Sequence, residues 1–461
     1  MSVLRNTAID WRRVAPLNRK DTRCGRYVLY WMQASQRERF NHALEYAATR
    51  ANELSLPLVA ALALTADFPD ANLRHYSFML QGLADTAAAL ARRGVQLVVR
   101  AGSPPEVIPE LAAEAAELVT DVGYLRIQRA WRRKVASRTS CRCVQVESDV
   151  VVPVRVAYPK EAVGARVIRG PIQRLLGEYL VPLRRVAVAK DSLALRLGGL
   201  DVAHWQEVLA GMKIDRSVAR VEREGGTTAA LRQWRSFLRR GLAQYHEARN
   251  DPSLDGGSRM SAYLHFGQLS PLELALDVLA ADAPAQAKDA YLEQLVVRRE
   301  LSMNLAHYNR RYDAFAALPA WARATLADHR RDKRPYLYTA AQLEAADTHD
   351  PYWNAAQRQM VQTGYMHNTM RMYWGKKILE WTTRPQTAFR RALYLNNKYF
   401  LDGRDPNGFA GVAWCFGKHD RPWAQRPVFG TVRYMNAAGL ERKYQMEHYV
   451  TGLALVLRRN Q

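Results

Sequence analysis

Tryptophan and arginine residues that can do chemistry meet in the segment MHNTMRMYWGKKILEW, residues 366–381. Trp374 and Trp381 are seven residues apart, which on a helix places them on the same face, about 10 Å apart along the axis. Indole rings so spaced either pack in a core or pass electrons, and packing is the more frequent role. A redox role for the pair therefore needs independent support.

A run of small residues precedes an aromatic segment in YHEARNDPSLDGGSRMSAYLHFGQLS, residues 245–270. Gly257, Ser258 and Ser261 lie in a loop ahead of an expected helix, where backbone N–H groups can meet a phosphate. An ordinary turn has the same composition, and such turns are more common than phosphate sites. The loop alone is a weak signal.

Two polar residues share a predicted helix in YLEQLVVRRELSMN, residues 291–304. Gln294 and Arg298 are four residues apart, so their side chains would lie on one face and could reach one ligand together. A surface ion pair of Arg298 with Glu293 explains the same pattern, and spacing does not choose between the two interpretations.

Arginines alternate with aromatic residues across residues 394–436. Asp402 lies in its Gly-rich and Asx-rich beginning, which turn formation explains without any function. Trp414 is followed by Arg421 and Arg433, and such a combination offers phosphate contacts from arginine and stacking platforms for bases. The residues alone favour a nucleic-acid-binding protein and leave a cofactor open.

The charge balance points in the same direction. The 461 residues include 67 Lys and Arg against 44 Asp and Glu, a formal net charge of +23. Such a surplus favours a polyanionic partner, although an arginine-rich solvated surface would give the same count. The four cysteines have neither metal-site nor disulfide-framework spacing. With no secretory signal and no apolar run of about 20 residues, we expect a cytosolic protein that binds no metal and no membrane.

The elements that position these residues fall into two classes. Short apolar runs alternate with helical stretches between residues 26 and 150, which predicts an α/β domain with a parallel sheet covered on both faces. Residues 1–25 resemble a polar arm, and 151–225 a connector. Residues 226–461 have helical periodicity and form an expected all-helical domain. Ser270 and Pro271 suit the N-cap and first position of one helix.

The site segments carry a specific family resemblance. The run from HDPYWNAAQRQMVQTGYMHNTMRMYWGKKILEW through LDGRDPNGFAGVAW to HDRPWAQRPVFGTVRYMN closely resembles the class II cyclobutane pyrimidine dimer photolyases. SAYLHFGQLS is similar to the flavin-binding signature of photolyases and cryptochromes, and VLYWMQASQRERFNHALEYA resembles the opening of the class II antenna domain. The resemblance covers most of residues 25–450 and is dense in the last hundred.

The family implies a Rossmann-like α/β domain and an all-helical domain that buries FAD. Its reaction repairs pyrimidine dimers in ultraviolet-damaged DNA: light excites reduced FADH⁻, which gives an electron to a dimer flipped out of the duplex, and the electron returns after the ring splits. The resemblance also implies a possible second chromophore, such as 8-hydroxy-5-deazaflavin, in the α/β domain.

The resemblance assigns the flavin side residue by residue. Arg371 and Asp402 match an ion pair beside the isoalloxazine ring, where a cation favours the anionic reduced flavin. Asn396 matches the asparagine near the flavin N5. The positions that match the phosphate- and ribose-binding residues are Tyr245, Gly257, Ser258, Arg259, Met260 and Ser261. Trp374 matches the tryptophan nearest the flavin, Trp353 the next one outward, and Trp381 a third candidate.

The lesion side carries one informative departure. Arg249, Met372, Trp414 and Arg433 match positions that line the dimer pocket or hold DNA, and Arg298 and Arg421 are further candidates for DNA contact. Gln294 aligns where the family usually has glutamate. An amide donates a hydrogen bond but supplies no proton, so we expect repair to persist with altered efficiency.

Two rival functions stay in view. A cryptochrome-like blue-light sensor would share the flavin and the tryptophans without repair, and Gln294 keeps that alternative open. The second rival is a flavin-free nucleic-acid-binding protein, in which every residue that matches the flavin-binding loop would have lost its function. We expect a light-driven photo-lyase that acts on DNA as a cytoplasmic monomer.

Overall fold

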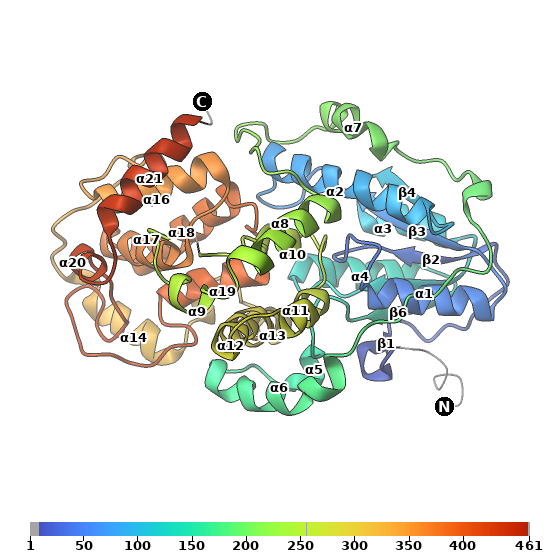
Figure 1. Cartoon of the computed structure of the whole chain (residues 1–461), viewed down its shortest axis with the longest axis horizontal. Coiled ribbons are helices and arrows are strands. Elements are labelled where there is room, and N and C mark those ends of the chain that lie inside the picture. The colour runs from blue at the N-terminus through green and yellow to red at the C-terminus, as the bar shows by residue number, and fades with distance from the viewer. Residues whose placement is uncertain (1–8, 255, 460–461) are drawn as a thin grey trace.

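The computed structural model describes residues 9–254 and 256–459. In Figure 1 a sheet with its helices forms the blue and cyan part at the right, and helices α8 to α21 lie to its left. The sheet has the strand order β1-β6-β5-β2-β3-β4. Its strands are β1 (Val14–Pro16), β2 (Tyr27–Trp31), β3 (Leu58–Leu64), β4 (Gln96–Ala101), β5 (Ala115–Asp121) and β6 (Arg142–Val146).

The predicted parallel sheet is confirmed. Strands β2 to β6 pair in parallel, and each lies in one of the apolar runs between residues 26 and 150. Helices α1 (His42–Glu53) and α2 (Leu73–Ala91) cover one face, while α3 (Pro104–Ala112) and α4 (Arg126–Arg138) cover the other. Burial on both faces is why these strands are continuously apolar.

The N-terminal segment differs from the expected polar arm. Strand β1 pairs antiparallel with β6 and extends the edge of the sheet, with Val14 opposite Val146. Three residues are too few to show an alternating pattern, so the sequence gives no strand signal here.

The predicted connector divides into two parts. Helices α5 (Val154–Ala157) and α6 (Ala165–Tyr179) share a hydrophobic core with α8 (Thr227–Arg240), around Ile172 and Trp234. Farther along, Val202 and Leu209, the latter on α7 (Trp205–Gly211), pack against the α1–α2 face of the sheet. The connector therefore contributes to the cores of both halves.

The remainder is helical, as predicted. Its helices are α8 (Thr227–Arg240), α9 (Tyr245–Ala248), α10 (Ser261–His265), α11 (Pro271–Ala280), α12 (Ala285–Leu292), α13 (Arg299–Tyr308), α14 (Ala320–Asp328), α15 (Ala340–Glu344), α16 (Pro351–Thr363), α17 (Asn368–Glu380), α18 (Pro385–Tyr399), α19 (Pro406–Cys415), α20 (Ala437–Glu441) and α21 (Met446–Arg459). Ser270 stands at the N-cap of α11 and Pro271 at its first position, as expected. Between α12 and α13 the chain continues as a π-helix, Glu293–Arg298, instead of an α-helix.

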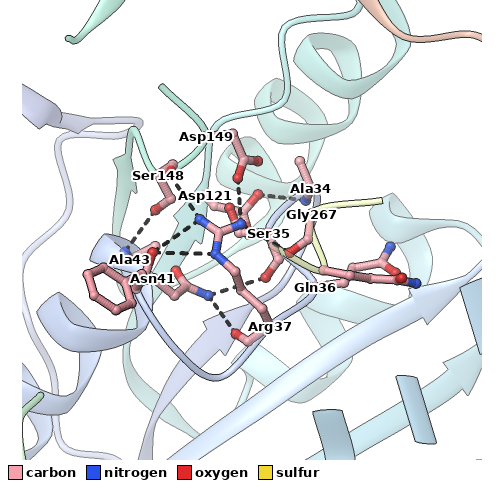
Figure 2. A network of polar contacts seen from close by, with 12 residues as sticks. Ala34, Ser35, Gln36, Arg37, Asn41, Ala43, Asp121, Ser148, Asp149 and Gly267 are labelled. Atoms are coloured by element: carbon pink, nitrogen blue, oxygen red, sulfur yellow. Dashed lines mark hydrogen bonds and ion pairs between the residues drawn. The ribbon is translucent and has the colours of Figure 1, made fainter. Parts of the chain in front are cut away.

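A buried arginine joins the two halves (Figure 2). Arg37, in the loop after β2, donates from Nη1 to Asp149 Oδ1 at 2.7 Å and to the carbonyl oxygen of Gly267 at 3.0 Å. Gly267 follows α10 with φ +64°, and a Cβ there would overlap the carbonyl oxygen of Ala34. Glycine is therefore required where the helical half meets the sheet.

The same loop is held by Asp121 at the carboxyl end of β5. Its carboxylate accepts the backbone N–H of Ala34 at 2.6 Å (Figure 2). It also accepts the backbone N–H of Gln33 at 2.9 Å and the hydroxyl of Tyr30 at 2.8 Å. Burial raises the pKa of Asp121 to about 6. These bonds fix the loop that carries Arg37, and so fix the helical half against the sheet.

Candidate functional site

A cavity of about 830 Å³ lies among the helices of the C-terminal half. Its wall is built from the loop before α10, the π-helical segment, α17, the end of α18 and α19. The predicted site residues that line it are Tyr245, Arg249, Ser258, Met260, Ser261, Gln294, Arg298, Arg371, Met372, Trp374, Asn396, Asp402, Trp414 and Arg433. Segments up to 188 residues apart in the sequence thus converge on one space.

The remaining predicted residues lie behind or beside this wall. They are Gly257, Arg259, Trp353, Trp381 and Arg421. The loop before α10 is fixed from outside: Gln233 donates to the Ser258 carbonyl oxygen at 3.0 Å, and Tyr291 donates its hydroxyl hydrogen to Ser258 Oγ at 3.0 Å. Tyr291 also lines the cavity.

The predicted ion pair is present. Arg371, on α17, places Nη2 at 2.9 and 3.0 Å from the two carboxylate oxygens of Asp402, which follows α18. Its guanidinium carbon lies 3.7 Å from the centroid of the Phe400 ring. The pair fixes a positive group in the cavity wall, where charge-assisted hydrogen bonds hold it in one orientation.

Asn396 lies in the same wall and is held by its neighbour. Its Nδ2 donates to Asn397 Oδ1 at 3.0 Å, and Asn397 Nδ2 in turn donates to Asp70 Oδ2 at 3.0 Å. Asn396 is 4% exposed. The amide is therefore fixed from the sheet side of the molecule.

The ion pair of Arg298 with Glu293 forms, while shared binding of one ligand by Gln294 and Arg298 stays a prediction. Each residue lines the cavity, and Arg298 Nε donates to Glu293 Oε1 at 3.0 Å. Arg169 on α6 binds the same carboxylate with Nη2 at 2.7 Å from Oε1. The π-helical geometry of this segment is a feature that the spacing argument missed, and π-helical turns are frequent at functional sites.

The three predicted tryptophans form a connected series. Trp374 is in the cavity wall and donates from Nε1 to Gln357 Oε1 at 2.8 Å. Trp353, on α16, donates from Nε1 to the backbone oxygen of Trp374 at 3.1 Å, and its ring centroid is 5.5 Å from that of Trp381. The structure thus places Trp353 between the other two.

The outer end of the series is covered. Trp381 is 1% exposed, and its ring packs edge-on against Tyr338 and His349 at centroid distances of 5.2 and 5.3 Å. The Tyr338 hydroxyl and His349 Nδ1 are 2.6 Å apart, and Tyr336 stacks on His349 at 3.6 Å. His349 and Tyr336 are exposed, so these rings lie between Trp381 and solvent.

A row of alternating indoles and cations begins at Trp414 in the cavity wall and leads outward. Arg433 lies 5.9 Å from the ring centroid of Trp414 and 4.7 Å from that of Trp423, which Arg421 approaches at 5.1 Å. Arg421, although outside the cavity wall, therefore belongs to the same row. Such a row suits contacts with phosphates and bases.

The sequence analysis missed three polar groups: His419 and His265 line this cavity, and Lys376 lies behind its wall next to Trp414. Lys376 is fully buried 5.0 Å from the Trp414 ring, its Nζ has no hydrogen-bond partner among the described residues, and burial lowers its pKa to about 8. His419 lines the wall, and burial lowers its pKa to about 3, so it is neutral near pH 7. His265 binds Asp405 at 3.1 Å. His265 could have been found from the sequence, because it lies in the segment SAYLHFGQLS that resembles a flavin-binding signature.

The cavity suits a large, partly anionic ligand such as FAD. Its volume lies within the range of about 300–1,000 Å³ found for cofactor sites. Arg249 Nε and His419 Nε2 are buried without a partner within the described part of the chain, and both residues line the cavity. Since buried polar groups normally have partners, these atoms fit a ligand that supplies them.

A smaller cavity of about 130 Å³ lies at the carboxyl ends of β2 and β3. It is lined from the sheet side by Trp31, Met32 and Trp131 and from the helical side by Phe266 and His265, and His265 also lines the larger cavity.

Residues 9–254 and 256–459 contain neither a cluster of metal-ligating side chains nor a membrane-spanning helix. No group of three His, Cys, Asp or Glu side chains is placed to hold a metal ion. No helix in this part of the chain is long and apolar enough to cross a membrane.

Comparison with known proteins adds independent findings. The family model described as DNA photolyase matches residues 28–188. A deoxyribodipyrimidine photo-lyase of Methanothermobacter thermautotrophicus is 51% identical over 426 residues, covering 92% of this chain and 94% of the relative. One from Arabidopsis thaliana is 38% identical over 441 residues, covering 92% and 88%.

Solved structures share the fold at low sequence identity. A class III photolyase from Agrobacterium tumefaciens superposes with a TM-score of 0.72 at 16% identity, covering 93% of this chain and 86% of the other. An archaeal photolyase from Sulfolobus tokodaii, solved with two FAD molecules, has a TM-score of 0.68 at 15% identity, covering 92% and 89%.

Proposed function

We infer the activity of this protein from the fact that the chain belongs to the DNA photolyase family. It is a deoxyribodipyrimidine photo-lyase, an enzyme that uses light to repair cyclobutane pyrimidine dimers in DNA. One observation supports the assignment to a site: the cavity of about 830 Å³ brings residues expected for a flavin together with residues expected for a lesion. We assign the enzyme to the class II type, which its C-terminal motifs resemble.

The flavin belongs in the large cavity. Bound there, reduced FAD supplies the light-driven electron that opens the cyclobutane ring. The guanidinium of Arg371, held by Asp402, favours a negative charge on a neighbouring ligand. Asn396 presents a fixed amide to the same space.

The loop before α10 holds the phosphates and the ribose. Ser258 and Ser261 offer hydroxyl groups, and Tyr245 closes this end of the cavity with a buried ring. Gly257, Arg259 and Met260 shape the loop, since Arg259 has φ +58° and Met260 is buried.

The lesion enters on the side of Trp414 and Arg433. Met372 and Trp414 offer surfaces for a flipped-out dimer, and Arg249 offers a guanidinium to its phosphate. Gln294 is the hydrogen-bond donor for a thymine carbonyl on this side. Arg298 and Arg421 complete the positive charge around the entrance.

The tryptophan series would carry electrons inward to an oxidised flavin bound in the cavity. Trp374 adjoins the cavity, and Trp353 and Trp381 extend the path away from it. Because Trp381 is buried, Tyr338 and His349 separate it from an external reductant.

A second chromophore stays a prediction. We assign the 130 Å³ cavity between the sheet and α10 as the place where a deazaflavin-type ring would be received. This volume is below that of typical cofactor sites, so such a ring requires displacement of the lining side chains. An absorption spectrum of the purified protein tests it: a visible band beyond those of FAD supports the assignment, and its absence after reconstitution with the deazaflavin contradicts it.

We also propose that the enzyme acts as a monomer on DNA in the cytoplasm. The substrate is DNA, and the cavity with its predicted residues is formed within one chain. Light scattering coupled to size-exclusion chromatography tests this state, and a dimer mass at micromolar concentration would contradict it.

Illumination of the reduced protein with dimer-containing DNA tests the function. We expect intact thymines to be restored in blue light and not in the dark. The rival, a sensor without repair, predicts flavin photoreduction with no restored thymine, and no observation in the structure favours it.

A further inference from the structure

A second concave surface lies outside the large cavity and shares no lining residue with it. A groove of about 670 Å³ runs between the end of α14 and the beginning of α18. It is lined by Ala327, Arg330, Arg331, Thr383, Arg384, Pro385, Gln386, Thr387 and Arg390. Four of its nine lining residues are arginines, and none is acidic.

The four arginines have no carboxylate partner. No ion pair or hydrogen bond of the Arg330, Arg331, Arg384 or Arg390 guanidinium occurs in the part of the chain that the structure describes, and all four are exposed. The carboxylate of nearby Asp332 is already bound by His329 and by the backbone N–H of Val428. The groove therefore holds about four uncompensated positive charges, which repel one another unless an anion binds.

The beginning of α18 adds to this positive potential. The helix has 15 residues, its N-cap residue Arg384 makes no capping side-chain bond, and its first turn has no acidic residue. Pro385 has no N–H, and the N–H groups of Gln386 and Thr387 have no acceptor within the described residues. A helix terminus of this kind supports the arginines in binding an anion.

The dimensions and chemistry favour a chain of phosphates. A single inorganic phosphate would leave most of the 670 Å³ unfilled and would engage only part of the arginines. Guanidinium groups bind phosphate oxygens with two parallel hydrogen bonds, and duplex DNA carries one charge per about 1.7 Å of its axis. The sugar–phosphate backbone of DNA fits both the volume of the groove and its charge.

The chain segment that carries Arg330 and Arg331 contacts the loop between α19 and α20. His329 Nε2 and Gln425 Nε2 are 2.9 Å apart, and Thr431 N donates to Thr325 on α14 at 3.0 Å. Figure 1 shows this loop passing beside α14. The same loop carries Arg421 and Arg433, so the groove arginines and the arginines at the lesion entrance lie on chain segments that contact each other.

We propose that this arginine groove is a second DNA-binding site, which holds backbone phosphates of the duplex flanking the lesion. It binds damaged and undamaged duplex equally, because it reads no base. The proposal concerns binding of the flanking duplex and is independent of the photochemistry assigned to the large cavity.

The test is a variant in which Arg330, Arg331, Arg384 and Arg390 are all replaced by Gln. Its affinity for an undamaged duplex of about three helical turns (~30 base pairs) is measured over a salt series. The slope of log K against log[salt] is negative, and each lost phosphate contact reduces its magnitude by about 0.9. We therefore expect the magnitude of the slope to decrease by roughly 2–4. Repair of a dimer in a duplex of about one turn (~10 base pairs) should stay at the wild-type rate.

A matched control removes the same net charge elsewhere. Arg92, Arg166, Arg174 and Arg184 are exposed and are outside both cavities, and their replacement by Gln lowers the charge equally. If the control reduces the magnitude of the slope as much as the groove variant, or if the groove variant leaves it unchanged, the groove does not bind DNA.

Two further outcomes distinguish DNA binding by the groove from membrane binding and from failure of the proposed function. A groove variant that loses affinity for anionic phospholipid vesicles while its DNA slope stays unchanged would assign the groove to a membrane surface and overturn the proposal. Loss of repair in the short duplex by wild-type enzyme would contradict the proposed function, and the salt slope on undamaged DNA would still test the groove.

Discussion

Trp374 adjoins the cavity and is the first of the three tryptophans in the series, since Trp353 donates to its backbone oxygen and packs against Trp381. In Trp374→Phe, we expect photoreduction of bound oxidised flavin to fall by at least about tenfold, because phenylalanine is much harder to oxidise than tryptophan. Repair by enzyme reduced chemically beforehand should be largely retained. Transient absorption and thymine recovery measure the two steps separately.

Trp234 supplies the matched control for this prediction. It is fully buried and donates to Asp277, but it belongs to the core around α8 and contacts none of the three indoles. Trp234→Phe should leave photoreduction unchanged. Equal photoreduction in Trp374→Phe and wild type would disprove the proposed path.

Gln294 lies where the resemblance to class II photolyases implies a glutamate. In Gln294→Glu, we expect the quantum yield of repair to rise several-fold, since a protonated carboxyl can both donate a hydrogen bond and deliver a proton. The gain should stay below the roughly 10²-fold effect of removing a whole hydrogen-bond donor. Repair at saturating DNA and at several pH values measures it, and an unchanged or lower yield at every pH would show that the amide is equally competent.

Single residues were predictable where a motif carried them. Arg371 and Asp402 form the expected pair although 31 positions separate them, because both lie in segments that resemble a known family. Lys376 and His419 were missed: their significance lies in burial without a partner, which depends on segments far away in the sequence.

Elements were predictable where their pattern is long. Buried parallel strands give apolar runs, and Ser-Pro gives a helix start, so β2 to β6 and α11 follow from the sequence. The edge strand β1 has three residues, too few for periodicity. The π-helical segment was missed because its residues have ordinary helix-forming side chains, and only the hydrogen-bond pattern distinguishes it.

Helix α13 carries a buried acid that makes stability depend on pH. Glu300 Oε1 accepts the N–H groups of Val151 and Val152 at 2.6 and 3.1 Å, and burial raises its pKa from 4.5 to about 8. Between these pH values the folded protein holds a proton that the unfolded chain has released, so stability falls as pH rises.

Glu300→Gln should remove this dependence. We expect the free energy of unfolding of the variant to exceed that of wild type by more than about 1 kcal/mol at pH 8.5, with the advantage shrinking towards pH 5. Urea unfolding at a series of pH values measures it. The control is Glu110→Gln on the exposed side of α3, and an identical pH profile for wild type and Glu300→Gln would refute the explanation.

At the scale of the whole molecule, the two halves meet through the loop that carries Arg37. Gly267→Ala should lower the free energy of unfolding by about 1–3 kcal/mol or more, because alanine at φ +64° is strained and its Cβ overlaps Ala34. Gly177→Ala on α6 is the control, since no atom lies within 4 Å of the added Cβ. Urea unfolding of both variants measures the difference.

The arrangement of the halves was only partly predictable. The sequence distinguished a sheet-containing part from a helical part, yet it placed residues 151–225 between them as a connector. Ile172 packs into the helical core and Leu209 into the core of the sheet, because apolar residues in irregular segments show no period that assigns them to a partner.

The number of residues in the π-helical segment determines which side chains line the cavity. Tyr291 before it, Gln294 and Arg298 within it and Ser302 after it all line the cavity. Each residue of an α-helix turns the chain by about 100°, so deletion of one residue that restored ordinary α-helix would rotate Ser302 and its neighbours away from the wall. This stretch can therefore accept substitutions far more readily than deletions, and the number of its residues is itself under functional constraint.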